Sequence, residues 1–295
     1  MMNKKEFLHL KSGTDVRGTA VETAEHGVQL TDETVQKICV GFYKWYCRKE
    51  QVDTFGIAVG RDCRISSPRI AAAAMAAFCA CGCRVFDCGL ATTPSMFMSI
   101  VENEPVQTAL EITASHHPFD RNGLKFFTSG GGLEGEDVSV ILELAYDAEV
   151  PAGTDNAPVV LPFMNDYAAL LRRQIVDGVQ NGDRPLEGLH IVVDAGNGVG
   201  GFYADQVLAP LGADVSGSQF LEPDGMFPNH IPNPENKGAI DAASKMVLNS
   251  SADLGLIFDT DVDRMGCIGA TGQEINRNTL VALAAAIVLE DHPGT

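Results

Sequence analysis

The chain has 295 residues, of which 45% are hydrophobic and 20% are charged, and these proportions are typical of a folded soluble protein. Its length is enough for about two domains of ordinary size. The excess of acidic over basic residues, 39 against 21, gives a net charge of -18 and argues against binding to nucleic acid or to an anionic membrane, because both need a basic surface.

The longest apolar run, residues 70–81, is shorter than the roughly 20 residues that a membrane span needs. The N-terminal lysines are not followed by the apolar core of a secretory signal. We therefore expect a cytoplasmic protein. Four cysteines lie close together at positions 79, 81, 83 and 88, but they lack the Cys-x-x-Cys spacing of a zinc site, so reduced, buried thiols are the favoured interpretation.

The first 150 residues alternate between strand-like and helix-like segments. Short, apolar, β-prone segments predict strands at residues 55–59, 83–86, 110–113 and 124–127. Helical patterns predict helices at residues 68–81, 94–101 and 136–148. Strands separated by helices indicate βαβ units and mainly parallel sheets.

A polar stretch with Pro151, Gly153 and Pro158 is typical of a linker. The elements predicted after it are a helix at 165–176, a strand at 190–193, a helix at 203–211 and a strand at 254–258. The sequence therefore predicts an α/β protein with two similar domains of mixed or parallel sheet, at residues 1–152 and 157–270.

The last predicted helix, residues 278–289, is apolar on so much of its surface that it needs a sheet to pack on. The sequence shows no further strand that would supply one. We expect residues 271–295 to be the truncated start of a third domain, and the chain to be the front part of a longer protein.

Three loops carry residues suited to chemistry, and the first contains Ser115, His116 and His117, followed by Lys125. A serine at the exit of a parallel strand lies where α/β folds bind ligands. The two histidines could move protons and Lys125 could hold a phosphate. The alternative is a turn serine before a proline, with both histidines on the surface.

The second loop follows the strand at 254–258 and carries Asp259, Asp261 and Asp263. Aspartates at alternate positions put hard oxygens on one side of a loop, which suits Mg²⁺. The alternative is an acidic loop exposed to solvent, which is less favoured because carboxylates so close together are costly without a cation. A calcium EF-hand would need glycine where Arg264 stands, and a phosphatase of the haloacid dehalogenase type would need threonine or valine in place of Asp263. Both of these motifs fail.

The third loop satisfies G-x-G-x-x-G with Gly196, Gly198 and Gly201, between a predicted strand and a predicted helix. A dinucleotide site also needs an acidic residue at the end of the next strand. Asp214 lies at the start of that strand and Glu222 lies too late in the sequence, so neither fits well. A tight structural turn is the alternative.

Two smaller segments fit an anion site. Residues 13–18 form a glycine-flanked loop that presents Arg17, and residues 60–64 add Arg61 and Arg64 after a strand. The alternative is that these arginines form structural pairs with the aspartates beside them.

In their order, these segments resemble the α-D-phosphohexomutases, the superfamily of phosphoglucomutase and phosphomannomutase. The run from Thr113 to Pro118 is similar to the family's phosphoserine loop, Thr-Ala-Ser-His-Asn-Pro, and residues 259–264 to its metal loop, Asp-Gly-Asp-Ala-Asp-Arg. Residues 13–18, 60–64 and 223–228 also look like family features. His117 in place of Asn, and Thr260 and Val262 in place of Gly and Ala, are departures that leave the serine and the aspartates in place.

The resemblance implies an intramolecular phosphotransferase that interconverts hexose 1-phosphate and hexose 6-phosphate, with hexose 1,6-bisphosphate as intermediate and activator. It implies a phosphate on Ser115, and Mg²⁺ held by that phosphoserine with Asp259, Asp261 and Asp263. The residues expected to hold the serine phosphate are Arg17, Lys125 and Arg264. Lys125 or His116 is expected to serve as acid or base for the sugar hydroxyl.

Two other functions stay open. One is an NAD-dependent oxidoreductase that uses Gly196, Gly198 and Gly201, and the other is a non-catalytic module that binds sugar phosphates. Members of the family normally have four domains, and the third and fourth bring a sugar-reading loop and a phosphate-clamping loop. We therefore expect residues 1–295 to bind Mg²⁺ but to show little turnover.

Overall fold

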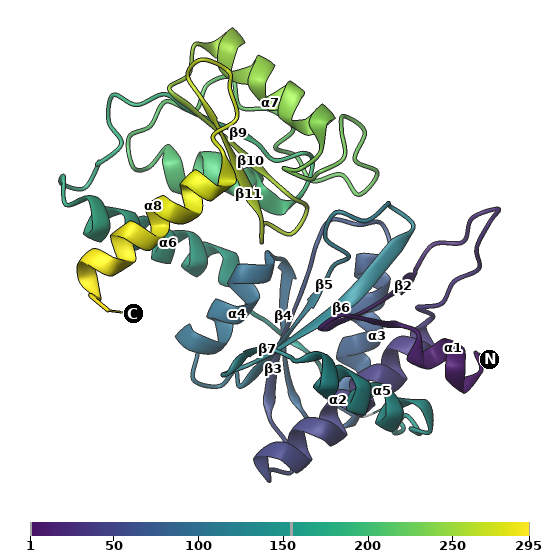
Figure 1. Cartoon of the computed structure of the whole chain (residues 1–295). Coiled ribbons are helices and arrows are strands. Elements are labelled where there is room, and N and C mark those ends of the chain that lie inside the picture. The colour runs from purple at the N-terminus through teal and green to yellow at the C-terminus, as the bar shows by residue number, and fades with distance from the viewer. Residues whose placement is uncertain (1, 154–155, 295) are drawn as a thin grey trace.

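The computed structural model describes residues 2–153 and 156–294, which form two α/β units on separate sheets (Figure 1). Within these residues the first sheet has eight strands in the order β1-β2-β6-β5-β3-β4-β8, with β7 paired to β6. The strands are β1 (Lys11–Ser12), β2 (Asp15–Thr19), β3 (Gly56–Arg61), β4 (Arg84–Leu90), β5 (Thr108–Ile112), β6 (Arg121–Thr128), β7 (Gly131–Gly132) and β8 (Val159–Val160).

The first sheet is mixed. Strands β5, β3, β4 and β8 pair in parallel, whereas the pairs β5–β6, β6–β2 and β2–β1 are antiparallel. The predicted fold class of mixed or parallel sheets is therefore confirmed, although the βαβ pattern alone indicated more parallel pairing than the β6 side of the sheet shows. The reason is that β5 returns through a short loop instead of a helical crossover, and a short loop can join only antiparallel neighbours.

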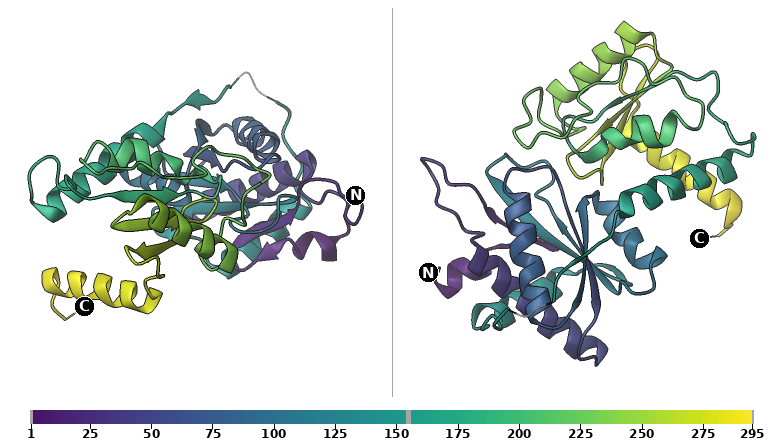
Figure 2. Two further views of the ribbon diagram at one scale, coloured as in Figure 1. Left: turned by 90° about the horizontal axis from the view of Figure 1, so that it is seen from above. Right: turned by 180° about the vertical axis from the view of Figure 1, so that it is seen from behind.

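Helices cover both faces of this sheet (Figures 1 and 2). The helices of this unit are α1 (Lys4–Leu8), α2 (Asp32–Glu50), α3 (Ser67–Ala80), α4 (Thr93–Glu102) and α5 (Gly135–Tyr146). Ile57 and Val59 of β3 point to the face covered by α2, α3 and α5, and Ala58 points to the face covered by α4. This alternation is the two-residue period of a strand buried on both sides.

The second sheet is smaller, with the order β11-β10-β9. Its strands are β9 (Ile191–Asp194), β10 (Leu254–Phe258) and β11 (Met265–Gly269), and β10 pairs in parallel with β9 and antiparallel with β11. Helix α7 (Lys237–Ser250) packs on one face, and a 3₁₀-helix (Val199–Gly201) followed by a π-helix (Tyr203–Leu208) lies on the other.

Helix α6 (Phe163–Val179) contacts both units. Phe163 and Tyr167 belong to the core on the α4 face of the first sheet, whereas Ile175 packs with the core around Val207 in the π-helix. The segment around Val159 also adds β8 to the edge of the first sheet. The residues expected to form a linker are thus partly built into the first unit.

Helix α8 (Arg277–Asp291) confirms the last predicted helix. It lies at the edge of the second unit, drawn in yellow in Figures 1 and 2, and its apolar side chains are exposed, with Val281 67% accessible. Among the residues that the structure describes, no helix combines the length and the apolar character needed to cross a membrane.

The remaining predicted strands and helices are present with shifts of a few residues, but residues 203–208 form a π-helix in place of the predicted α-helix. Sequence analysis missed the helices α1, α2 and α7 and the strands β1, β2, β7, β8 and β11. Helix α2 has many β-branched and aromatic residues, which lower helix propensity, and packing decides its structure instead. Gly41 shows this, because a Cβ there would lie 2.5 Å from the carbonyl oxygen of Ile141 in α5.

Cys79, Cys83 and Cys88 are buried in the hydrophobic cores, as predicted, and Cys81 is half-buried. Burial raises the pKa of the Cys83 and Cys88 thiols to about 12. These thiols are therefore protonated at neutral pH and behave as small apolar side chains.

Candidate active site

The loop after β5 presents Ser115 in an uncommon backbone conformation. Its φ angle is +52°, in the left-handed region, and the residue is only 4% exposed. The backbone N–H of Ser115 donates to Thr113 Oγ1 at 2.9 Å. A left-handed non-glycine residue costs about 1–2 kcal/mol, so the surrounding contacts must hold it.

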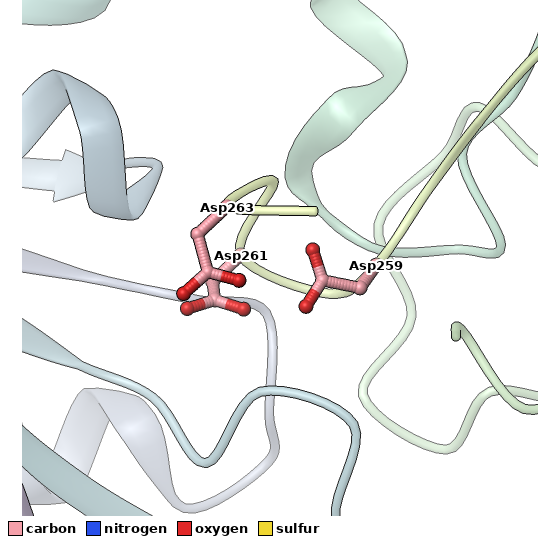
Figure 3. Close-up of side chains that lie close together, drawn as sticks. All are labelled: Asp259, Asp261 and Asp263. Atoms are coloured by element: carbon pink, nitrogen blue, oxygen red, sulfur yellow. The ribbon is translucent and has the colours of Figure 1, made fainter. Parts of the chain in front are cut away.

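The loop between β10 and β11 brings three carboxylates together. One oxygen each from Asp259, Asp261 and Asp263 lies within 4.8 Å of the others. Figure 3 shows the three side chains turned toward one another from a single tight loop. Val262, between two of the aspartates, has a φ angle of +61°, which is strained for a β-branched residue. The loop therefore has an energetically costly backbone conformation at Val262, and its three carboxylates lie on one side.

The two loops meet although they are 144 residues apart in the chain. Ser115 Oγ donates to Asp259 Oδ2 at 3.0 Å and accepts from Arg264 Nη2 at 2.6 Å. Arg264 also donates to Asp259 Oδ2 through Nη2 at 2.7 Å and through Nε at 3.1 Å. The serine hydroxyl therefore lies at the edge of the carboxylate cluster, beside a guanidinium.

Lys125 of β6 reaches the same cluster from the first unit. Its Nζ lies 2.8 Å from Asp263 Oδ2 and 3.5 Å from Asp261 Oδ2. Although burial lowers the pKa of Lys125, the two carboxylates outweigh this effect and raise it. Lys125 is therefore a fixed positive charge, which argues against a role as a proton acceptor.

Thr93 at the start of α4 also contacts the aspartate loop between β10 and β11, and the sequence analysis did not single it out. Its Oγ1 donates to Asp261 Oδ2 at 2.6 Å and its N–H donates to the Asp261 carbonyl at 2.9 Å. A helix N-terminus stabilises a carboxylate through its dipole and its free N–H groups. Nothing about a Thr-Pro helix start points to this contact 168 residues away.

The electrostatics of the three aspartates fit a hard cation. Burial, followed by the charges of Asp261 and Asp263, raises the pKa of Asp259 to about 8. Burial also acts to raise the pKa of Asp263, but Lys125 and Arg264 outweigh it and hold that pKa below its ordinary value. Within the described residues, the buried Asp261 Oδ1 has no hydrogen-bond partner. An acceptor-only oxygen that is buried and unsatisfied is what a cation would use.

Both histidines of the serine loop are neutral at physiological pH. Burial and the charges of Arg264 and Arg17 lower the pKa of His116, and burial with Arg17 lowers that of His117 to about 4. His116 Nδ1 lies 2.7 Å from Arg264 Nη2 and 3.3 Å from Ser115 Oγ. Because a guanidinium only donates, Nδ1 is the acceptor nitrogen of the His116 ring.

Arg17 and Arg64, from the two smaller segments, have different surroundings. Residues 15–19 form β2, which corrects the prediction of a flexible loop, and Arg17 donates to the Ala114 carbonyl at 3.3 Å and to Asp15 at 2.9 Å. Arg64 is completely buried and donates to backbone carbonyls of the serine loop. Arg17 therefore lies beside Ser115, but Arg64 is not available to an anion.

The third loop has a structural explanation. A Cβ on Gly198 would lie 2.8 Å from the Thr260 carbonyl oxygen, and one on Gly201 would lie 2.1 Å from that of Leu221. Gly196 has a φ angle of +53°. Close backbone packing and one left-handed residue account for all three glycines, and this supports the alternative of a tight structural turn.

Comparison with known proteins agrees with this arrangement. The family description "Phosphoglucomutase/phosphomannomutase, alpha/beta/alpha domain I" matches residues 10–150, and the corresponding domain II matches residues 166–272. The chain belongs to this family. The resemblance inferred from the serine and aspartate loops is confirmed, and the first matched segment contains Ser115 and the second contains the three aspartates.

Curated relatives of this chain include a phosphomannomutase/phosphoglucomutase of Pseudomonas aeruginosa, 33% identical over 240 residues, and a phosphoglucomutase of Neisseria gonorrhoeae, 34% identical over 238 residues. The alignments cover 81% of this chain, but only 49% and 50% of those relatives. The chain thus spans about half the length of the curated relatives it matches.

Among solved structures, a phosphoglucomutase/phosphomannomutase family protein of Burkholderia thailandensis matches with a TM-score of 0.81 and 26% identity, over 100% of this chain and 61% of that one. A Thermus thermophilus protein described as a "putative phosphomannomutase" matches with a TM-score of 0.76 at 18% identity, over 94% of this chain and 61% of that one, which shows the shared fold. The α/β architecture of both units is therefore that of the family.

Glu111 of β5 is a further buried acid near the site that the sequence analysis missed. It is fully buried, opposite Lys125 in the β5–β6 register. Burial, with the neighbouring charges of Asp62 and Asp261, raises the pKa of Glu111 well above its ordinary value. Burial therefore disfavours the ionised form of Glu111.

Proposed function

We propose that a protein with this chain is a phosphohexomutase, which moves a phosphate between the 1- and 6-hydroxyls of a hexose through a phosphate carried on Ser115. The observation that supports it best is the position of Ser115 Oγ, 3.0 Å from Asp259 Oδ2 and 2.6 Å from Arg264 Nη2. A hydroxyl at the junction of a carboxylate cluster and a guanidinium suits a group that accepts and releases phosphate.

Asp259, Asp261, Asp263 and an oxygen of the Ser115 phosphate would hold Mg²⁺. Three carboxyl groups with oxygens within 4.8 Å of one another, one of them with a buried unsatisfied oxygen, fit this ion. A phosphoserine carries about -1.5 to -2 charges at neutral pH and would be repelled by the aspartates alone. When bound, the ion would neutralise that charge and polarise the phosphoryl oxygens.

In the proposed transfer, the free hydroxyl oxygen of a hexose monophosphate bonds to the phosphorus while the bond from phosphorus to Ser115 Oγ breaks. The hydroxyl loses a proton and Ser115 Oγ gains one, and neutral His116, whose Nδ1 lies 3.3 Å from Ser115 Oγ, would carry that proton once Nδ1 is released from Arg264; Lys125 is held protonated between two carboxylates. Arg264 stabilises the negative charge that develops on Ser115 Oγ. The product is a hexose 1,6-bisphosphate.

The bisphosphate then turns and returns its other phosphate to Ser115, which completes the isomerisation and makes the bisphosphate an activator of dephosphorylated enzyme. Arg17 and Lys125 would hold the serine phosphate, since Arg17 lies against the Ala114 carbonyl and Lys125 lies across the aspartate loop. We assign the serine loop to a first domain at residues 1–152, the aspartate loop to a second at 157–270, and residues 271–295 to the start of a third.

Mass spectrometry of the Ser115 peptide tests the proposal. Residues 1–295 are incubated with Mg²⁺ and α-D-glucose 1,6-bisphosphate, and we expect a phosphate adduct on Ser115 that Ser115→Ala abolishes. Ser139→Ala, which replaces a half-buried serine of α5 that bonds to Lys11 and the Gly135 carbonyl, is the matched control and leaves the adduct intact. Parent protein that binds the bisphosphate but stays unmodified would instead indicate a non-catalytic sugar-phosphate-binding module.

An NAD-dependent oxidoreductase remains the other alternative from the sequence, and it leaves the contacts of Ser115 with Asp259 unexplained. Titration of the protein with NADH, followed by fluorescence, checks it directly. Saturable enhancement of NADH fluorescence by the parent protein would favour the oxidoreductase over the mutase.

A further inference from the structure

Arg64 is a buried guanidinium that faces the backbone of the serine loop. It follows β3, and its side chain is 0% exposed. Nη1 donates to the carbonyls of Pro118 at 2.7 Å and Arg121 at 3.2 Å. Nη2 donates to the carbonyl of His117 at 2.7 Å and to that of Ser115 itself.

These contacts use every donor of the side chain. A guanidinium has five N–H groups, and the fifth, on Nε, donates to Asp62 Oδ2 at 3.1 Å. Asp62 is fixed in turn by Ser67 Oγ at 2.6 Å and by the Arg64 backbone N–H at 3.0 Å. Arg64 therefore has no N–H left for a substrate phosphate, and four of its five hydrogen bonds go to one loop of seven residues.

The loop needs such support because of the backbone at Ser115. Its left-handed φ of +52° is unfavourable for a residue with a Cβ. The donor on its carbonyl fixes the peptide plane that follows Ser115, and this plane sets the direction of the Cα–Cβ bond. Oγ then lies between Asp259 and Arg264.

The second unit contributes the other side of the Arg64 environment. The ring of Phe227 lies 5.2 Å from Arg64 Cζ, within the range of a cation–π contact. Gly225 allows the approach, because a Cβ there would lie 2.5 Å from the Cys63 carbonyl oxygen and 2.7 Å from Arg64 Cα. The segment is held within its own unit by the hydrogen bond from Asn197 Nδ2 to the Glu222 carbonyl at 2.9 Å.

We propose that Arg64 is a positioning residue for phosphoryl transfer, which acts through the backbone of Ser115, and that Phe227 of the other unit keeps its guanidinium in place. This inference rests on the proposed function of Ser115. It links the contact between the two units to the orientation of the nucleophile, and it distinguishes Arg64 from Arg17, Lys125 and Arg264, which are assigned to the phosphate itself.

Transfer kinetics of Arg64→Lys test the proposal. Lysine keeps the charge but has three donors without the planar fork. We measure the rate at which residues 1–295 take labelled phosphate from α-D-glucose 1,6-bisphosphate, as a function of its concentration. The maximum rate should fall about 100-fold, because a displacement of about 1 Å in a reacting group has an effect of that size. The half-saturating concentration should change less than about threefold.

The matched control is Arg69→Lys. Arg69 also donates to an aspartate and to backbone carbonyls, those of Ala20 and Leu30, but it does not contact the serine loop. Its transfer rate should stay within about twofold of the parent. Guanidinium ions added to Arg64→Ala should restore at least about tenfold of the lost rate, because they refill the site that the side chain leaves.

Three results would overturn the proposal: transfer by Arg64→Lys at the parent rate, an increase in the half-saturating concentration with an unchanged maximum, or an equal loss in Arg69→Lys. If the Arg64 variants do not fold, Phe227→Leu decides. This variant should lower the maximum rate about fivefold, because the cation–π contact with Arg64 is lost. A parent-like rate would refute the proposal that Phe227 keeps Arg64 in place.

Hydrogen exchange separates this inference from the proposed function. If the parent itself takes no phosphate, the proposed function fails, and the amides of residues 115–121 still report on Arg64. They should exchange at least about tenfold faster in Arg64→Lys than in the parent and in Arg69→Lys. Equal exchange in all three proteins would show that Arg64 does not hold the loop.

Discussion

The pH dependence of Mg²⁺ binding follows from the position of Asp259. Its carboxyl group is 0% exposed, and burial with the charges of Asp261 and Asp263 raises its pKa to about 8. At pH 7 the free protein therefore carries a proton on Asp259, and a metal ion must displace it. At pH 9 the carboxylate is already ionised.

With a pKa of about 8, the ionised fraction rises from about one in eleven at pH 7 to about ten in eleven at pH 9. We therefore expect Mg²⁺ affinity to increase about tenfold over this range, and roughly one proton to be released for each ion bound at pH 7. Above pH 9 the affinity should be flat with respect to this group.

Isothermal titration calorimetry in two buffers with different ionisation enthalpies measures both quantities. Asp259→Asn should bind Mg²⁺ more weakly and lose the pH dependence between pH 7 and pH 9. Asp241→Asn removes an exposed carboxylate of α7 and should behave as the parent does. Equal parent affinities at pH 7 and pH 9, or no proton release at pH 7, would refute the account of Asp259 as a buried, protonated ligand.

Three further outcomes check other parts of the structure. Ser115→Gly should be about 1 kcal/mol more stable in urea denaturation than Ser115→Ala, because glycine adopts the left-handed φ without strain, and equal stabilities would contradict the strained loop. Gly201→Ala should lose at least about 2 kcal/mol of unfolding free energy, since its Cβ would lie 2.1 Å from a backbone oxygen, whereas Gly178→Ala, with open space around it, should lose none. Burial lowers the pKa of His230, but the hydrogen bond to Asp194 outweighs it and raises the pKa. The stability that protonated His230 contributes is therefore present at pH 6 and lost as the pH rises through its folded-state pKa, so the difference in unfolding free energy between parent and His230→Gln should be larger at pH 6 than at pH 9.

Local sequence determined the loops that carry the chemistry. Asp259, Asp261 and Asp263 are every second residue of one loop, and this spacing already places the carboxylates on one side. The serine loop and the apolar strands β3 and β10 were predicted for the same reason, because each depends on residues within a few positions of one another. The family resemblance followed from these same short segments.

Only the tertiary structure decided which distant groups meet. Thr93 reaches Asp261 across 168 residues, and Lys125 turned out to be held between two carboxylates of the other unit. Arg64, expected in an anion site, instead donates to the carbonyls of the serine loop. These partners follow from how the two sheets pack together, and a guanidinium or a hydroxyl in the sequence carries no record of which acceptor the fold will bring within 3 Å.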